Sequence, residues 1–192
     1  MLKNKRKLFG AGFTLIELLV VMAILGILAT IALASFTSAQ ARSRDSRRKS
    51  DLKQIETALE LYYSDHEVYP GPSSGKILGC PSTGTPLSCE WGVEGSRSEF
   101  TDGKTTYMKI VPTDPSKAYN YYYRALTVDS VANQGFQLFA KLENTKDMNC
   151  LPDLTGKPSC TSPANIPSGV TCGTGVTCNF ALTSPNATAT QE

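Results

Sequence analysis

The sequence predicts an α+β fold in which one long N-terminal helix packs on a small antiparallel sheet, with disulfide-stapled loops near the C-terminus. Three observations support this. Residues 13–65 contain no proline and change from largely apolar to amphipathic. Two later segments have the composition of strands joined by a turn. All cysteines of the chain follow residue 79: Cys80, Cys89, Cys150, Cys160, Cys172 and Cys178.

The first part of the expected helix, residues 13–36, carries Glu17 as its only charge. A helix of this length extends about 36 Å, enough to cross a hydrocarbon core of about 30 Å, so we interpret it as a single-pass anchor. A secretory signal peptide is the alternative, because a basic segment precedes the run and Ala39 and Ala41 give a small-x-small pattern. The apolar run is longer than the usual signal-peptide core.

The second part of the helix, residues 37–65, is amphipathic. Leu52, Ile55, Leu59 and Tyr62 recur at helical spacing and form one apolar stripe. The run Arg42–Lys49 before them is polar, and we expect it to be a solvated helix face. A helix of this total length would reach about 78 Å, so its apolar half must be buried by lipid or by sister subunits.

The residues that follow supply a partner for the stripe. Segments 114–128 and 135–143 are predicted to pair as antiparallel strands across a turn-forming stretch. Alternation places Phe136 and Leu138 on one face and Gln137 and Phe139 on the other, which is an imperfect pattern. Segment 71–92 is expected to be a loop. We assign residues 66–182 to a globular head and residues 183–192 to a flexible tail.

The cysteine count is even and confined to the region after the anchor, which indicates disulfides in an oxidising compartment. Six cysteines allow 15 pairings, with a slight preference for neighbours in sequence. A zinc site is disfavoured because no C-x-x-C occurs and the only histidine, His66, is distant. The cysteines place the C-terminal part outside the cytoplasm.

No catalytic set is evident, so we predict that the chain is not an enzyme. Ser73 lies in a G-x-S-x-G string, but it lacks the strand and helix that a nucleophile elbow needs. The net charge of +2 gives no general reason to expect nucleic acid binding. No cofactor is expected, except that Asp147, Asn149 and Asp153 are oxygen ligands that calcium could use.

The segment "KLFGAGFTLIELLVVMAILGILATIALASF" resembles the leader and N-terminal helix of type IV pilins and their pseudopilin relatives. The specific part is a short basic leader, residues 1–12, that ends in Gly12 and is followed by "FTLIEL". The resemblance implies cleavage by a prepilin peptidase between Gly12 and Phe13 and N-methylation of Phe13. It also implies that Glu17 pairs with the new α-amino group of a neighbouring subunit during assembly.

The family further implies a subunit held in the cytoplasmic membrane and then assembled as a homopolymer at the cell surface. Its implied partners are the prepilin peptidase, a membrane platform protein and an assembly ATPase. A type IV pilus subunit for adhesion, motility or DNA uptake is our first prediction. A pseudopilin of type II secretion is the alternative, and a membrane-anchored binding domain that never polymerises is the second alternative.

Overall fold

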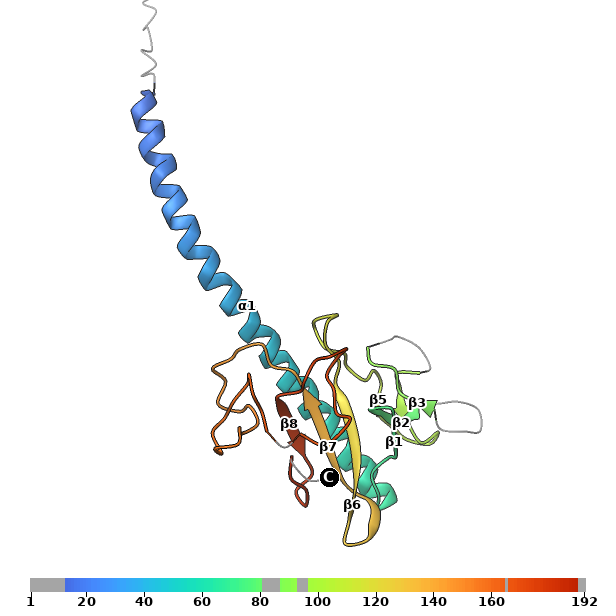
Figure 1. Ribbon diagram of the computed structural model, residues 1–192. Helices are drawn as coiled ribbons and strands as arrows, with labels where there is room; N and C mark the ends of the chain where they lie inside the picture. Colours follow the sequence, from blue (N-terminus) through green and yellow to red (C-terminus); the bar gives the residue numbers. More distant parts are fainter. Residues whose placement is uncertain (1–12, 81–86, 93–96, 165, 190–192) are drawn as a thin grey trace, which may run out of the picture. The chain divides into compact units, whose positions relative to one another are not determined.

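A computed structural model describes residues 13–80, 87–92, 97–164 and 166–189 of the chain. Its contacts divide the chain into two compact units, Met1–Gln40 and Ala41–Glu192. One helix, α1 (Leu15–His66), contributes to both. The prediction of a long continuous helix is therefore confirmed, and its end before the proline-containing segment at residue 70 agrees with the sequence (Figure 1).

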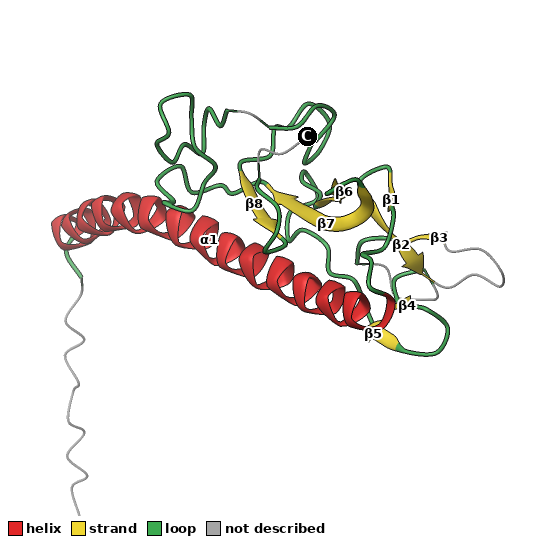
Figure 2. Cartoon of the chain, turned by 90° about the horizontal axis from the view of Figure 1, so that it is seen from below, coloured by secondary structure: helices red, strands yellow, loops and turns green. Residues whose placement is uncertain are grey.

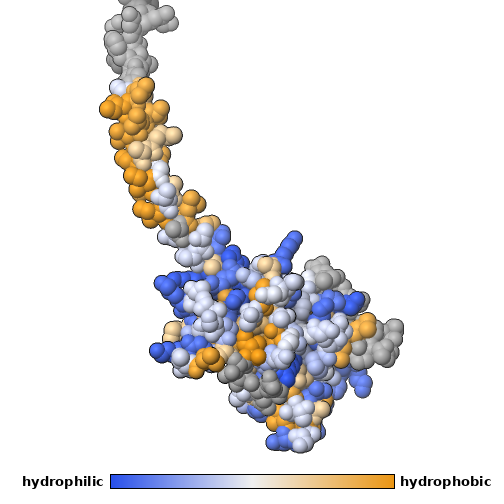
Figure 3. All heavy atoms as spheres, viewed as in Figure 1, coloured by the Kyte–Doolittle hydropathy of each residue, from blue (hydrophilic) through white to orange (hydrophobic). Residues whose placement is uncertain are grey.

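In the first unit the described part of α1 has no other element around it, and its large apolar side chains are exposed. Figure 3 shows hydrophobic side chains over the visible surface of this part of the helix. The helix is long and apolar enough to cross a membrane by length and composition.

The second unit contains the main antiparallel sheet, formed by β6 (Tyr122–Val128), β7 (Val131–Ala140) and β8 (Phe180–Thr183) in that order. β6 and β7 are joined at Asp129 and Ser130, which have φ angles of 50° and 66°. Two consecutive residues of positive φ are typical of the tight turn that suits a β-hairpin. The predicted hairpin is confirmed, but its turn is shorter and β7 begins earlier than predicted.

Short strands surround the main sheet. β1 (Pro72–Ser73), β2 (Lys76–Cys80) and β3 (Leu87–Ser88) form one small antiparallel sheet, and β4 (Phe100–Thr101) pairs with β5 (Thr106–Met108). The prediction of an unbroken loop over residues 71–92 was therefore wrong. The segment "KILGC" forms a strand because Ile77 and Cys80 reach the core, at 1% exposure each.

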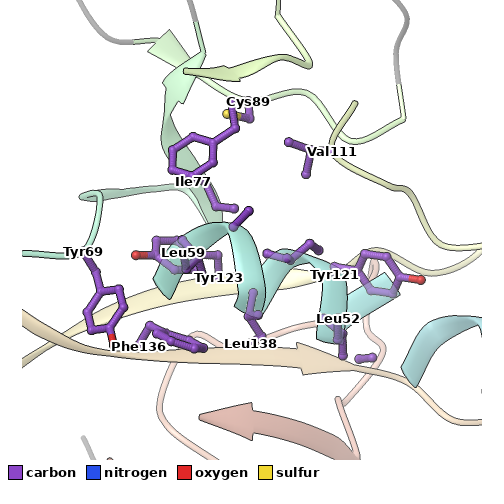
Figure 4. Packing of buried hydrophobic residues seen from close by; sticks show 14 of the residues in the cluster. Leu52, Leu59, Tyr69, Ile77, Cys89, Val111, Tyr121, Tyr123, Phe136 and Leu138 are labelled. Atoms are coloured by element: carbon purple, nitrogen blue, oxygen red, sulfur yellow. The ribbon is translucent and has the colours of Figure 1, made fainter. Parts of the chain in front are cut away.

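The main core lies between α1 and one face of the β6–β7 hairpin (Figure 2). Figure 4 shows Leu52 and Leu59 of the helical stripe among Tyr123, Phe136 and Leu138 of the sheet. These five side chains are fully buried. The stripe predicted from the sequence thus faces the predicted sheet.

The opposite face of β7 is buried as well. Phe139 packs there in a second cluster with Leu151, Val170 and the Cys172–Cys178 disulfide. This explains the imperfect alternation in β7, because a strand covered on both faces can carry apolar residues at successive positions.

The predicted tail also differs from the structure. Thr183 belongs to β8, and Ser184 is buried and accepts a hydrogen bond from the Phe136 amide. Asn186 donates its side-chain amide to the Gln134 carbonyl. Residues 183–188 therefore make contacts with the head, where the sequence led us to expect a flexible tail.

Candidate assembly site on the amino-terminal helix

The start of α1 is organised by Thr14 and Glu17. The Thr14 backbone N–H donates to Glu17 Oε2 at 2.8 Å, and the Thr14 hydroxyl donates to the same oxygen at 2.6 Å. The Glu17 amide donates back to Thr14 Oγ1 at 3.3 Å. This is a capping box, in which an N-terminal threonine and the glutamate three residues later satisfy amides that the helix leaves unpaired.

The capping box leaves part of the Glu17 carboxylate available. Only Oε2 is engaged, and Oε1 has no hydrogen bond or ion pair within the described part of the chain. The carboxylate is therefore oriented by its own helix and can still accept a cation from outside. A threonine three residues before a glutamate is the sequence pattern of a capping box, so this feature could have been predicted from the sequence.

The structure describes only the residue that follows the predicted cleavage site. Gly12 and the leader, residues 1–12, lie outside the described residues. Phe13 is described and is 80% exposed. The assignment of cleavage and N-methylation to this bond stays a prediction.

The surface that follows Glu17 is apolar and unburied in this chain. Between Leu15 and Phe36 the large apolar side chains keep from 46% to 82% of their surface exposed. An exposed apolar surface of this extent marks a membrane or protein contact.

The polar run Arg42–Lys49 is not the uniformly solvated face that we predicted. Arg48 is completely buried, and its guanidinium contacts three carboxylates. It forms two bonds with Asp114, at 2.7 and 2.8 Å, and one with Asp45 at 2.7 Å. The prediction failed because the sequence did not show which distant acids would converge on this position.

The other acids of this cluster connect α1 to the segment after β7. Asp45 accepts the backbone N–H groups of Glu143 and Asn144, at distances of 2.8–3.1 Å. Hydrogen bonding from Arg44, with further bonds and charge from Arg48, lowers the pKa of Glu143 against the opposing effect of burial. We call Arg44, Asp45, Arg48, Asp114 and Glu143 the Arg48 cluster.

His66 lies at the end of α1. Its Nε2 is 3.1 Å from Asp102 Oδ2 and 3.2 Å from the Tyr107 hydroxyl. Its ring stacks on Tyr62 with centroids 4.2 Å apart. Two backbone N–H groups of the 102–105 turn and the Tyr107 hydroxyl lower the pKa of Asp102. The group joins the helix end to the β4–β5 hairpin.

All six cysteines pair with their neighbours in sequence, and this pairing agrees with the preference drawn from their spacing. The bonds are Cys80–Cys89, Cys150–Cys160 and Cys172–Cys178.

The predicted calcium ligands are engaged within the protein. Asp147 Oδ2 pairs with Lys49 Nζ at 2.7 Å, and its Oδ1 accepts the Asn149 amide. Asp153 Oδ1 accepts donors from Thr155 and Lys157 in its own turn. Among the described residues no group of three or more histidine, cysteine or acidic side chains is placed to share a metal ion. Calcium binding stays a prediction that this arrangement does not favour.

These features define a class of protein in which a long, exposed apolar helix precedes a disulfide-stapled α+β unit. Comparison with known proteins supports this class. Residues 11–33 match the family model of the prokaryotic N-terminal methylation motif. The chain is 35% identical over 106 residues to the type II secretion system core protein G of Pseudomonas aeruginosa, covering 55% of this chain and 67% of that protein.

Further relatives include a second type II secretion core protein and a type IV pilin. The core protein G of Vibrio cholerae is 35% identical over 116 residues, covering 59% of this chain and 69% of its own. The type IV major pilin protein PilA of Myxococcus xanthus is 50% identical over 58 residues, covering 30% of this chain and 26% of PilA. No solved structure matches the chain. The chain belongs to the type IV pilin and pseudopilin family.

Proposed function

We propose that the chain is a type IV pilin that is cleaved between Gly12 and Phe13 and polymerises into a surface filament. The observation that carries this proposal is the exposed apolar surface between Leu15 and Phe36. Lipid covers it while the subunit waits in the membrane, and sister helices cover it in the filament. The prepilin peptidase, the platform protein and the assembly ATPase would be its partners.

Glu17 would set the register of assembly. Cleavage creates an α-amino group at Phe13. Glu17 Oε1, which has no partner among the described residues, can accept a hydrogen bond from this group in a neighbouring subunit. A buried carboxylate without a partner costs several kcal/mol, so wrong axial staggers would be penalised. The capping box supports this role because it fixes the carboxylate before the partner arrives.

A pseudopilin of type II secretion is the second candidate, because the relatives with long alignments include the core protein G of two species. The disulfide-stapled region after residue 147 favours the surface filament, since an outer head must persist outside the cell. A membrane-anchored binding domain that never polymerises remains the third candidate.

Electron microscopy and intact mass spectrometry of sheared surface material test the proposal. We expect filaments built from a chain that begins at Phe13 and carries one added methyl group. A chain that still begins at Met1, or one that begins at Arg42, would contradict the processing step. Deleting the gene should remove the filaments and leave protein secretion intact; loss of secretion without loss of filaments would favour the pseudopilin.

The Glu17→Val variant tests the pairing, with Leu18→Val as the matched control for a valine in the same turn. We expect Glu17→Val to abolish or shorten filaments and Leu18→Val to leave them normal. Normal filaments from Glu17→Val would overturn the pairing. An anchored domain would give no filaments from any variant or from the unaltered chain.

A further inference from the structure

The second unit has a hollow of about 470 Å³ that the assembly helix does not use. It is lined by residues 74–76, 90–91, 113, 120–122, 171 and 173–174. Every lining residue is among those that the structure describes. The volume lies within the range of about 300–1,000 Å³ that is typical of ligand sites.

The walls of this hollow are held in place by covalent bonds and close backbone packing. Cys89 of the Cys80–Cys89 bond precedes Glu90 in the chain, and Cys172 of the Cys172–Cys178 bond lies between the lining residues Thr171 and Gly173. Gly75 has a φ of +77°, and a Cβ there would lie 2.5 Å from the Tyr122 ring. A Cβ at Gly173 would lie 2.7 Å from the Ala118 carbonyl oxygen. A pocket fixed in advance loses little conformational entropy when it binds.

The side chains that line the hollow are mostly polar, and five of them have no partner among the residues that the structure describes. The side chains of Asn120, Thr171 and Thr174 make no hydrogen bond or ion pair to the residues that the structure describes, and the same is true of Ser74 and Thr113. Hydroxyl and amide groups both donate and accept hydrogen bonds. This set can therefore bind a ligand that itself carries many hydroxyl groups.

The charged and aromatic side chains of the lining further restrict the chemical class of ligand that the hollow can bind. The two charged lining residues, Lys76 and Glu90, pair at 2.6 Å, and Glu90 also pairs at 3.0 Å with Arg97, which is not part of the lining. Trp91 is half-buried at the edge of the hollow, with its ring perpendicular to that of Tyr121 at 6.0 Å. A wall of hydroxyl and amide groups with an aromatic ring, whose charged side chains are paired, suits a neutral ligand with many hydroxyl groups better than a cation or an aliphatic chain.

We propose that this hollow binds a neutral saccharide. In the context of the proposed surface filament, each exposed head would then carry one weak glycan site, and many copies along a filament would add their affinities by multivalency. The inference deepens the adhesion role and rests on the proposed function for its biological meaning. The binding itself belongs to the single subunit and does not require polymerisation.

Trp91 is the only tryptophan of the chain, so its fluorescence reports directly on the hollow. The experiment uses the full chain in a zwitterionic detergent without a sugar headgroup, titrated with lactose, a mannose trisaccharide and an N-acetylglucosamine trisaccharide. We expect a saturable fluorescence change with at least one of them. Asn120→Ala and Thr171→Ala should each weaken binding about two- to tenfold, as loss of one hydrogen bond predicts.

The control is Thr161→Ala, which removes a threonine hydroxyl from an exposed position outside the hollow and should leave the affinity unchanged. Absence of any fluorescence change with all three sugars would overturn the proposal. So would equal weakening by Thr161→Ala, or tighter binding of a sialylated sugar or inorganic phosphate than of every neutral sugar. A chain that binds sugar but forms no filaments would contradict the proposed function alone, and filaments without sugar binding would contradict this inference alone.

Discussion

Arg48 and Asp114 form a two-pronged ion pair that is closed to solvent, with Nε–Oδ2 and Nη2–Oδ1 distances of 2.7 and 2.8 Å. Arg48 belongs to α1, and Asp114 belongs to the loop before β6. The planar guanidinium suits such paired contacts with a carboxylate. Together with Asp45 and Glu143, this pair fixes the second half of α1 to two separate segments of the head.

Replacing Arg48 by alanine should strongly destabilise the head. The change leaves Asp45, Asp114 and Glu143 close together without their shared cation, and breaking a buried pair in this way costs about 3–5 kcal/mol. Arg47→Ala is the matched control, because Arg47 is exposed and lies 3.9 Å from Asp51. Its loss should cost less than about 1 kcal/mol. Urea unfolding of the full chain in detergent measures both, and similar losses for the two variants would contradict the role of the cluster.

The pH dependence of stability should depend on Glu143. Arg44 and Arg48 hold the pKa of Glu143 below its ordinary value of 4.5 in the folded chain. As the pH falls, the Glu143 carboxylate therefore takes up a proton at higher pH in the unfolded chain than in the folded chain. The contribution of ionised Glu143 to stability is complete above pH 4.5 and is lost as the pH falls through the lowered pKa. We expect Glu143→Gln to flatten the fall in unfolding free energy on acidification. The exposed-site variant Glu67→Gln is the control. If the unfolding free energy falls with pH at the same slope in both variants, this role of Glu143 is refuted.

The capping box predicts a local effect of Thr14. Thr14→Val removes the hydroxyl that donates to the Glu17 carboxylate and accepts from the Glu17 amide. The change should destabilise the first turn by about 0.5–2 kcal/mol. Amide hydrogen exchange of residues 15–18 in detergent micelles should become faster, whereas Thr30→Val, in the middle of the helix, should leave these amides unchanged. Unaltered exchange in Thr14→Val would show that the box does not hold the turn.

Much of this fold followed from local patterns. The stripe of Leu52 and Leu59, the β6–β7 hairpin and the neighbour pairing of cysteines depend on short-range periodicity, turn chemistry and spacing. The buried role of Arg48 could not be predicted, because its partners Asp114 and Glu143 are 66 and 95 residues away. β8 was missed for the same reason, since a four-residue strand is stabilised by pairing with β7 rather than by its own composition.

Removing calcium should leave the head unchanged. The Asp147 carboxylate is already neutralised by Lys49, and Asp153 is satisfied within its own turn. We expect a chelator to leave the melting temperature of the full chain unchanged. Added calcium should also leave it unchanged, both in the unaltered chain and in Asp153→Asn. If chelation lowers the melting temperature of the unaltered chain but not that of Asp153→Asn, the chain does bind calcium at this site.

The Cys172–Cys178 bond should hold one wall of the head rather than the whole fold. It closes a loop with a sequence separation of 6 residues, and for so short a loop the chain-entropy model gives about 2 kcal/mol. Because both sulfurs are buried against Phe139, the Cys172→Ser/Cys178→Ser variant should also place polar groups in the second core cluster. Limited proteolysis should then cut first within residues 171–178. The matched variant Cys80→Ser/Cys89→Ser should leave that segment protected, and cutting at the same segment in both variants would mean that the bond does not act locally.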